Sequence, residues 1–252
     1  MNHGLLEKLK GLEVKLQDSY VQNMAATIDS ENLILQVQRS PQATMDDFLF
    51  EVGHYLKLLR PGDPDAQPRK LLHVACGNGL YNLVFTAFYR EIVNLDPVEE
   101  MLVHARRICR NLEGQTYVRD YGHNIGRHYP PHSFDDVFCI GIANIVADAA
   151  DYFAILDAVS HVVKEGGRLV LGRIPDLAKR DPYLASLPAI LAPKGFSRER
   201  IEQIVRDNRA VNWYAMEEIT RFLKERGGIC TIHPVNVQHI GHECMSDISV
   251  QF

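Results

Sequence analysis

From residue 71 to the end of the chain, short apolar runs alternate with longer segments of helical periodicity. Short strands with little polar alternation are typical of a sheet that is covered on both faces. Their alternation with helices indicates βαβ units. The expected strands are LLHVAC, EIVNLD, TYVRD, FDDVFCIGIA, RLVLGRI, ICTIHPVNV and DISVQF. The sequence therefore predicts an α/β fold with a seven-stranded, mostly parallel sheet, helices on both faces and a terminal antiparallel pair.

Two further segments have helical character. Residues 1–60 are expected to form an N-terminal helical lid, which includes a helix from Met45 to Leu59 with acids in its first turn. Residues 61–252 are expected to form the main domain, with an insertion of loops and short helices at about 176–212. The glycine pair at 166–167 is expected to end the helix that precedes the fifth strand.

Composition excludes several classes of protein. The 252 residues are 46% hydrophobic and 23% charged, which is the ordinary globular range. The net charge of −5 gives no basic footprint for nucleic acid, and no stretch is long enough to span a membrane. The five cysteines form no CxxC pair or metal-ligand cluster, and the N-terminus has no signal-peptide core. We expect a cytoplasmic protein, a monomer or homodimer, that binds a small molecule and no metal.

The stretch LLHVACGNG, residues 71–79, indicates a strand that breaks into a glycine turn before a helix. Such a turn presents backbone N–H groups, and the missing side chains let a ligand approach Gly77 and Gly79. Asp96 ends the second strand and is suited to accept hydrogen bonds from ribose hydroxyls. Asp120 ends the third strand and could bind an adenine amino group. Together these strand ends predict a nucleoside site.

These motifs, in this order, resemble the class I S-adenosylmethionine (SAM)-dependent methyltransferase family, whose fold is Rossmann-like. LLHVACGNG is similar to the first family motif, NLDPVEEMLVHARR to the second and RDYGH to the third. SFDDVFCIGIANIV is similar to the fourth strand with its loop, and VSHVVKEGGRLVL, ERGGICTIHPV and SDISVQF to the remaining elements. The resemblance covers about residues 45–252 and implies SAM as cofactor.

The resemblance also implies roles for single residues. Gly77 and Gly79 would pass under the amino-acid part of SAM, and Asp96 would bind the ribose. Met101 would flank the adenine, and Asp120 would meet its amino group. The implied cofactor-binding residues are Ala75, Gly77, Gly79, Asp96, Pro97, Met101, Asp120, Tyr121 and Ile140.

Two positions depart from the family pattern. His73 stands where the family has Asp or Glu, and Ala75 replaces the first glycine. Ala75 is expected to be a small change, because alanine adopts most backbone angles of non-glycine residues. His73 cannot supply a full negative charge to the SAM amine. Either it is a neutral, buried histidine bonded to a backbone carbonyl, or SAM is held differently here.

The catalytic candidates are Asn144, Tyr20 and His73. Asn144, in the loop after the fourth strand, would hold a nucleophile or cap the next helix. Tyr20 would offer its ring to a sulfonium from the lid, or is a helix-face aromatic. Arg173 would bind a carboxylate or form a surface salt bridge.

The histidine-rich loop 121–132 has irregular spacing and is expected to be a solvated loop without metal. The aromatic residues Tyr183, Trp213 and Tyr214, in or beside the insertion, are expected near an acceptor pocket.

The favoured function is SAM-dependent methylation of a small molecule. One alternative resembles the azetidine-2-carboxylate synthases, in which SAM closes a ring on itself and methylthioadenosine is released. His73 is consistent with this chemistry, because removal of an acid partner disfavours the charged amine. The other alternative is a non-catalytic SAM-binding partner subunit.

Overall fold

The computed structural model describes residues 44–62, 68–235 and 242–252. Of the predicted N-terminal lid, the described part contains helix α4 (Met45–Leu59), which has the predicted bounds. This helix begins at a capping box: Thr44 Oγ1 accepts from the Asp47 N–H, and the Asp47 carboxylate accepts from the Thr44 N–H. Tyr20 and the rest of the predicted lid lie outside the described residues.

A seven-stranded sheet forms the centre of the molecule, in the order β3-β2-β1-β4-β5-β7-β6. β1 pairs in parallel with β2 and β4, whereas β7 is antiparallel to β5 and β6. The strands are β1 (Lys70–Val74), β2 (Glu91–Leu95), β3 (Gln115–Val118), β4 (Phe134–Ile140), β5 (Val163–Pro175), β6 (Ile229–Pro234) and β7 (Met245–Gln251). The predicted sheet and its terminal antiparallel pair are confirmed. The strand order reverses direction between β1 and β4, which is where open α/β sheets bind ligands.

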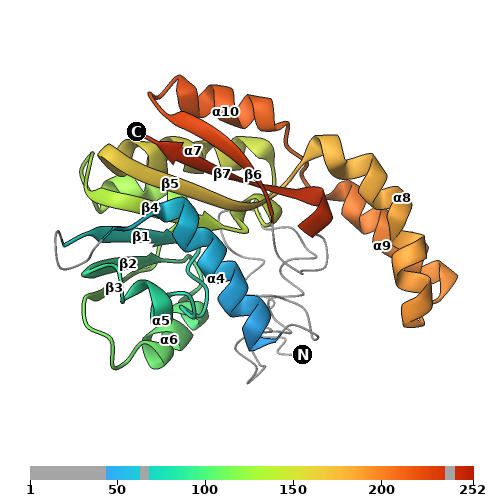
Figure 1. Cartoon of the computed structure of the whole chain (residues 1–252), viewed down its shortest axis with the longest axis horizontal. Coiled ribbons are helices and arrows are strands. Elements are labelled where there is room, and N and C mark those ends of the chain that lie inside the picture. Colours follow the sequence, from blue (N-terminus) through green and yellow to red (C-terminus); the bar gives the residue numbers. More distant parts are fainter. Residues whose placement is uncertain (1–43, 63–67, 236–241) are drawn as a thin grey trace.

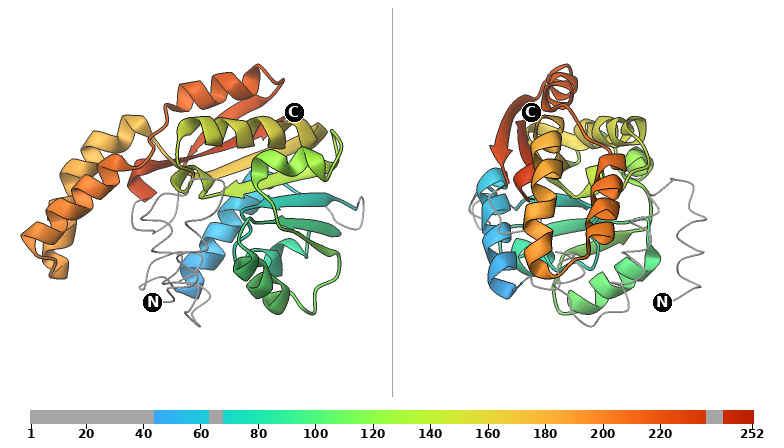
Figure 2. Two further views of the ribbon diagram at one scale, coloured as in Figure 1. Left: turned by 180° about the vertical axis from the view of Figure 1, so that it is seen from behind. Right: turned by 90° about the vertical axis from the view of Figure 1, so that its right-hand side faces the viewer.

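Helices cover both faces of the sheet (Figures 1 and 2). The helices that follow α4 are α5 (Asn82–Phe85), α6 (Glu99–Ile108), α7 (Ala149–Val162), α8 (Arg180–Leu191), α9 (Arg198–Ala210) and α10 (Met216–Lys224). The short 3₁₀ segments are η1 (Gly122–Arg127), η2 (Ile142–Asn144), η3 (Leu177–Lys179), η4 (Ala192–Lys194) and η5 (His242–Cys244).

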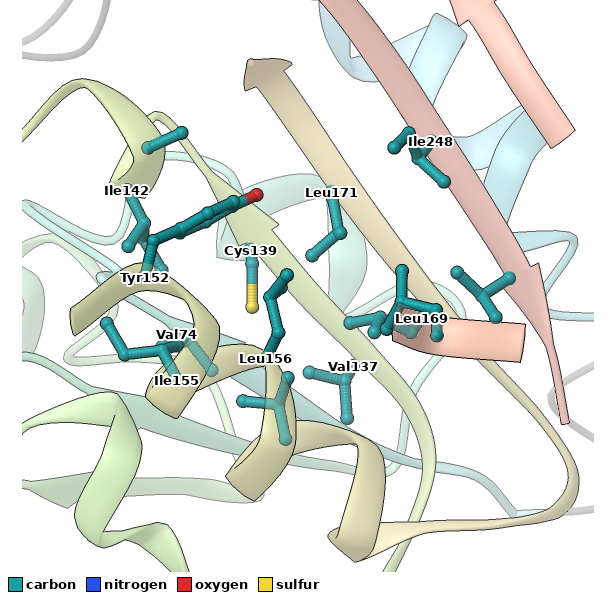
Figure 3. Packing of buried hydrophobic residues seen from close by; sticks show 14 of the residues in the cluster. Val74, Val137, Cys139, Ile142, Tyr152, Ile155, Leu156, Leu169, Leu171 and Ile248 are labelled. Carbon is teal, nitrogen blue, oxygen red and sulfur yellow. The ribbon is translucent and has the colours of Figure 1, made fainter. Parts of the chain in front are cut away.

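Consecutive residues of one strand supply two separate cores, because strand side chains alternate between faces. Phe138 of β4 packs in the cluster with Tyr55 of α4 and Phe85 of α5. Its neighbour Val137 packs in the other cluster with Leu156 of α7. Figure 3 shows this second cluster, in which α7 lies over β4 and β5. Burial on both faces explains why the strands read as continuous apolar runs.

Two predicted boundaries are wrong. The helix α7 already ends at Val162, and the glycine pair at 166–167 lies inside β5. Val163 pairs with Phe134 of β4, and a register shift follows before Asp136. Gly166 has a φ of 76°, which favours glycine. The glycine pair therefore lies at the irregular pairing near the start of β5 and does not end a helix.

The predicted insertion folds into two helices, α8 and α9, which we call the helical hairpin (residues 180–210). The two helices lie side by side and project beyond the sheet (Figures 1 and 2). Their shared core is Leu184, Leu187, Leu191 and Ile201. The hairpin follows the carboxyl end of β5 and therefore extends from the edge of the sheet where the predicted site residues lie.

Candidate functional site

A small, mostly apolar pocket lies at the carboxyl ends of β1, β2 and β4, on the α7 side of the sheet. Its lining residues are Val74, Ala75, Leu95, Pro97, Tyr121, Gly122, His123, Ile142, Ile145, Val146, Asp151 and Ile155. Val74 and Ile155 face each other beside it (Figure 3). They lie so close that a Cβ on Gly122 would come within 2.9 Å of Ile155 and 3.1 Å of Val74. The pocket is thus continuous with the α7-side core.

The two glycines of the turn have different surroundings. Gly77 has a φ of 54° and Gly79 a φ of 75°, both in the left-handed region that favours glycine. A Cβ on Gly77 would meet open space, whereas a Cβ on Gly79 would lie 3.0 Å from Ala105 Cβ in α6. Gly77 therefore leaves room where a ligand could approach the backbone, and Gly79 lets α6 pack closely.

Ala75 lines the pocket and also has a positive φ, of 53°. The premise that alanine is a small change at this position is therefore wrong, since this backbone region is costly for a residue with a Cβ. Ala75 thus adopts the left-handed backbone conformation that usually favours glycine.

Asp96 connects the glycine turn to the start of α6. Its side chain is 5% exposed and accepts hydrogen bonds from the N–H groups of Gly77 at 3.0 Å and Val98 at 2.9 Å. The carboxylate is thereby held between the turn and Pro97, which lines the pocket. A carboxylate has lone pairs for further donors, so Asp96 can also accept from hydroxyl groups.

Asp120 organises the segment after β3. Its carboxylate accepts from the Tyr121 N–H and Asn124 Nδ2, each at 2.8 Å, and pairs with His128 Nε2 at 2.7 Å. Burial raises the pKa of Asp120, but the hydrogen bonds from His128, Asn124 and the Tyr121 N–H outweigh it and lower that pKa. These contacts place the Tyr121 ring, which lines the pocket and stacks on His123.

Six of the nine predicted cofactor residues are outside the pocket lining: Gly77, Gly79, Asp96 and Asp120, described above, and also Met101 and Ile140. Met101 is buried within α6, and Ile140 packs against the cluster on the α4 side of the sheet. Within the pocket lining, Asp151 and Ile155 of α7 lie outside the sequence motifs. Asp151 and Ile155 are one helical turn apart, so their helical spacing was the available signal.

His73 lies fully buried on the other face of β1. Its Nδ1 donates to Asn82 Oδ1 at 3.0 Å, because an amide oxygen accepts only. Asn82 Nδ2 donates to Asn94 Oδ1, and Asn94 Nδ2 donates to Gln115 Oε1 at 3.0 Å. Burial lowers the pKa of His73 to about 4, so the ring is neutral near pH 7. The partner is thus an amide side chain, not the expected backbone carbonyl.

The ring of His73 is surrounded by aromatic side chains. Phe138 lies 5.2 Å away between centroids, and Tyr81 and Phe85 each lie 6.0 Å away. The Nε2 atom has no hydrogen-bond partner within the described residues. His73 therefore lies in the α4-side core, and a catalytic role for it stays a prediction.

Asn144 ends η2, and its Nδ2 donates to the carbonyl of Arg173 at 2.8 Å. It does not cap α7; Asp148 takes that place by accepting from the Asp151 N–H at 2.9 Å. Arg173 is buried, and its Nε donates to Glu51 of α4 at 2.7 Å. Burial lowers the pKa of Arg173, but the Glu51 charge outweighs it and raises that pKa. The pair is therefore internal, not a surface salt bridge.

The three aromatic residues near the hairpin have mainly structural contacts. Tyr214 is buried, and its hydroxyl donates to the Ala143 carbonyl at 3.3 Å. Tyr183 and Trp213 are 6.4 Å apart between ring centroids, at the base of the hairpin. The Leu177 N–H donates to the Tyr214 carbonyl at 2.9 Å. These contacts fix the hairpin to the loops at the pocket edge of the sheet.

Part of the histidine-rich loop, residues 122–127, forms the η1 segment. His132 has a φ of 57° and its Nδ1 donates to the Val163 carbonyl at 2.9 Å. Among the described residues, no three His, Cys, Asp or Glu side chains gather as they would around a metal ion. Within the same residues, no helix has the length and apolar character that a membrane span needs.

Comparison with known proteins agrees with this architecture. Residues 72–171 match a family model described as a methyltransferase domain. No curated protein matches the chain. The matched segment runs from β1 into β5 and includes the glycine turn, Asp96, Asp120 and the β4 loop.

Several solved structures have a similar fold. The N-methyltransferase NodS from Bradyrhizobium japonicum WM9, in complex with S-adenosyl-L-homocysteine (SAH), is 12% identical with a TM-score of 0.60, covering 92% of this chain and 96% of NodS. A DhpI–SAH complex is 17% identical with a TM-score of 0.56, covering 100% and 98% of the two chains. ChlM from Synechocystis PCC 6803, with bound SAH, is 12% identical with a TM-score of 0.57, covering 92% of both chains.

At these identities the solved structures establish the fold alone. The match to a methyltransferase domain supports SAM as the cofactor predicted from the sequence. Fold and family match together support a place for this chain in the class I SAM-dependent methyltransferase family.

Proposed function

We propose that this protein transfers the methyl group of SAM to a small-molecule acceptor. The observation that carries the proposal is the pocket at the carboxyl ends of β1, β2 and β4, which Ala75 lines at the start of the glycine turn, together with the hydrogen bond from the Gly77 N–H to Asp96. This is the switch point of the sheet, where open α/β sheets bind ligands, and the apolar walls of the pocket suit a nucleoside. We further propose that the protein is cytoplasmic and acts as a monomer or homodimer.

The residues at and beside the pocket suit the cofactor. A Cβ on Gly77 would have no heavy atom within 4 Å, so a ligand has room to approach this backbone. Asp96 would hold the ribose hydroxyls, and the apolar walls around Pro97 and Ile142 suit a flat heteroaromatic ring. When bound, SAM supplies an electrophilic methyl group on a positively charged sulfur.

Methyl transfer requires alignment and a dry site more than acid–base chemistry. The apolar lining residues Ile142, Ile145 and Val146 exclude water at the β4 loop. In the same loop, Asn144 Nδ2 donates a hydrogen bond to the Arg173 carbonyl, which anchors the loop to β5. Its amide oxygen is our candidate for orienting an acceptor O–H or N–H group.

Three observations support a small acceptor. The net charge of −5 gives no broad basic surface for nucleic acid. The helical hairpin projects beyond the edge of the sheet where the strands β1, β2 and β4 end, and we propose that it contributes to the acceptor site there (Figure 2). Among the structural neighbours, ChlM is a magnesium protoporphyrin IX methyltransferase, which acts on a small molecule.

The first test is incubation of the purified protein with SAM, alone and with pools of phenols, amines and carboxylic acids. Mass spectrometry would follow SAH and methylthioadenosine together. The proposal expects SAH in at least one pool, with a product heavier by one methylene, and no methylthioadenosine above the control without protein. Failure of SAM or SAH to bind in calorimetry would overturn it.

The two alternative functions give other outcomes. Methylthioadenosine formed from SAM alone, with a matching amino-acid fragment, would mean the cyclase or lyase. Binding of SAM without either product in any pool would favour a non-catalytic partner subunit. The cyclase hypothesis depends on His73 lying near the SAM amine. The contacts of His73 are instead with Asn82 and with aromatic rings of the α4-side core.

A further inference from the structure

A carboxylate of α4 joins two segments at the pocket edge of the sheet. Glu51 is fully buried and accepts a hydrogen bond from the Tyr81 hydroxyl at 2.8 Å. The same carboxylate accepts from Arg173 Nε at 2.7 Å. These three residues, which we call the Glu51 triad, come from α4, the start of α5 and the end of β5.

Each partner of Glu51 is connected to a loop of the candidate site. Tyr81 is the N-cap residue of α5 and follows the glycine turn by two residues. Arg173 accepts, through its carbonyl, the Asn144 Nδ2 hydrogen bond at 2.8 Å. Through Glu51, the glycine turn and the β4 loop are therefore held by one side chain from a third element.

Arg173 occupies a backbone conformation that points to a role beyond packing. Its φ is 59°, in the left-handed region, although it is not a glycine. Its N–H donates to Asp247 Oδ1 of β7 at 2.8 Å, so the surrounding structure holds this conformation. Strained residues persist where neighbours over-determine them, and they gather at functional sites. A buried ion pair is also a poor source of stability compared with apolar packing.

A second triad with the same chemistry lies at the opposite edge of the sheet. Asp136, near the start of β4, is fully buried and accepts from the Tyr89 hydroxyl at 2.8 Å. It also accepts from a terminal nitrogen of Arg69 at 2.8 Å. Asp136 is as buried as Glu51 and has the same types of partner, a tyrosine and an arginine. It contacts neither the glycine turn nor the β4 loop. A substitution of Asp136 therefore measures the loss of a buried carboxylate without a direct effect on these two loops.

We propose that Glu51 and Arg173 are positioning residues, which hold the glycine turn and the Asn144 loop in the spacing that SAM binding and methyl transfer require. The inference rests on the proposed function and deepens it. Glu51 acts on the turn through Tyr81, and Arg173 acts on the β4 loop through its own carbonyl. Neither residue needs to touch the cofactor.

The test compares Glu51→Gln with the matched control Asp136→Asn, using SAH as the probe in calorimetry. Urea denaturation first establishes conditions in which both variants are folded. We expect Glu51→Gln to weaken SAH binding at least fivefold, and Asp136→Asn to stay within twofold of the wild type. Two milder substitutions, Tyr81→Phe and Arg173→Lys, keep the test available if Glu51→Gln does not fold.

Rescue distinguishes positioning from general stability. Arg173→Lys keeps a cation for Glu51 and is expected to retain SAH binding better than Arg173→Met, even where the two melt at similar temperatures. Unchanged affinity in folded Glu51→Gln, or equal weakening in Glu51→Gln and Asp136→Asn, would overturn the inference. A wild-type protein that does not bind SAH would instead overturn the proposed function, and the inference with it.

Discussion

The backbone N–H of Gly77 donates to the carboxylate of Asp96 across 3.0 Å, and so joins the turn after β1 to the end of β2. The same carboxylate accepts from the Val98 N–H at 2.9 Å, just before α6 begins. One side chain thus sets the distance between two strand ends that border the pocket. Strand ends that are far apart in sequence become one site because parallel strands present their carboxyl ends at a single edge.

Asp96→Ala is expected to lower the affinity for SAM by an order of magnitude or more. The substitution removes both the predicted ribose acceptor and the bond that holds Gly77. Isothermal titration with SAM measures the loss. Asp157→Ala serves as the control, because Asp157 forms an exposed ion pair with Arg226 and is not part of the pocket lining. Unchanged affinity in Asp96→Ala would remove Asp96 from the cofactor site.

Gly77→Ala and Gly79→Ala are expected to fail in different ways. Both place a Cβ in the left-handed region, at a cost of about 1 to 2 kcal/mol. At Gly79 the Cβ also meets Ala105, so the total loss of stability is expected to reach about 2 to 4 kcal/mol. At Gly77 the Cβ meets no protein atom and enters the space that we assign to the cofactor, so SAM affinity is expected to fall more than stability. Urea titration and calorimetry on both variants separate the effects, and equal profiles would contradict this assignment.

His73→Phe is expected to change how stability depends on pH. Burial lowers the pKa of His73 to about 4 from 6.5, so the folded state binds the proton less well than the unfolded state. The neutral ring therefore contributes stability that is present above pH 6.5 and lost as the pH falls toward 4. This loss is about 3 kcal/mol at 1.36 kcal/mol per pKa unit.

At pH 7 the variant is expected to be less stable than the wild type by about 1 to 3 kcal/mol, because Asn82 Oδ1 loses its donor. The difference should shrink as the pH falls from 6.5 to 4. Urea titrations of both proteins at pH 7, 5.5 and 4.5 measure it. A difference that stays constant over this range would show that His73 does not titrate as its burial predicts.

Gly172→Ala is expected to displace α4 from β5. An added Cβ would lie 2.7 Å from the Tyr55 hydroxyl and 2.9 Å from two ring atoms of the same side chain. Because both residues are buried, overpacking should cost about 1 to 3 kcal/mol of stability. The double variant Gly172→Ala, Tyr55→Phe removes the nearest atom and should recover part of that cost in a double-mutant cycle. Strict additivity of the two substitutions would contradict the contact.

The alternation of strands and helices, the glycine turn and the places of Asp96 and Asp120 after the second and third strands followed from local patterns in the sequence. Apolar runs with turn residues between them predict a parallel sheet, because each strand must be buried on both faces. The boundaries around α7 did not follow, because the pairing of Val163 with Phe134 draws the chain into β5 before the glycine pair. Pairing between distant strands overrode the local breaker signal of Gly166.

The candidate site shows the same division. The sequence alone predicts that Gly77 and Asp96 follow the first and second strands, and it contains the motifs that indicate SAM. Only the tertiary structure decided that His73 faces an aromatic core, that Ala75 keeps a positive φ, and that Glu51 meets Arg173 across 122 positions. The physical reason is that burial, backbone strain and ion pairing depend on neighbours from other elements, and periodicity along one segment carries no information about them.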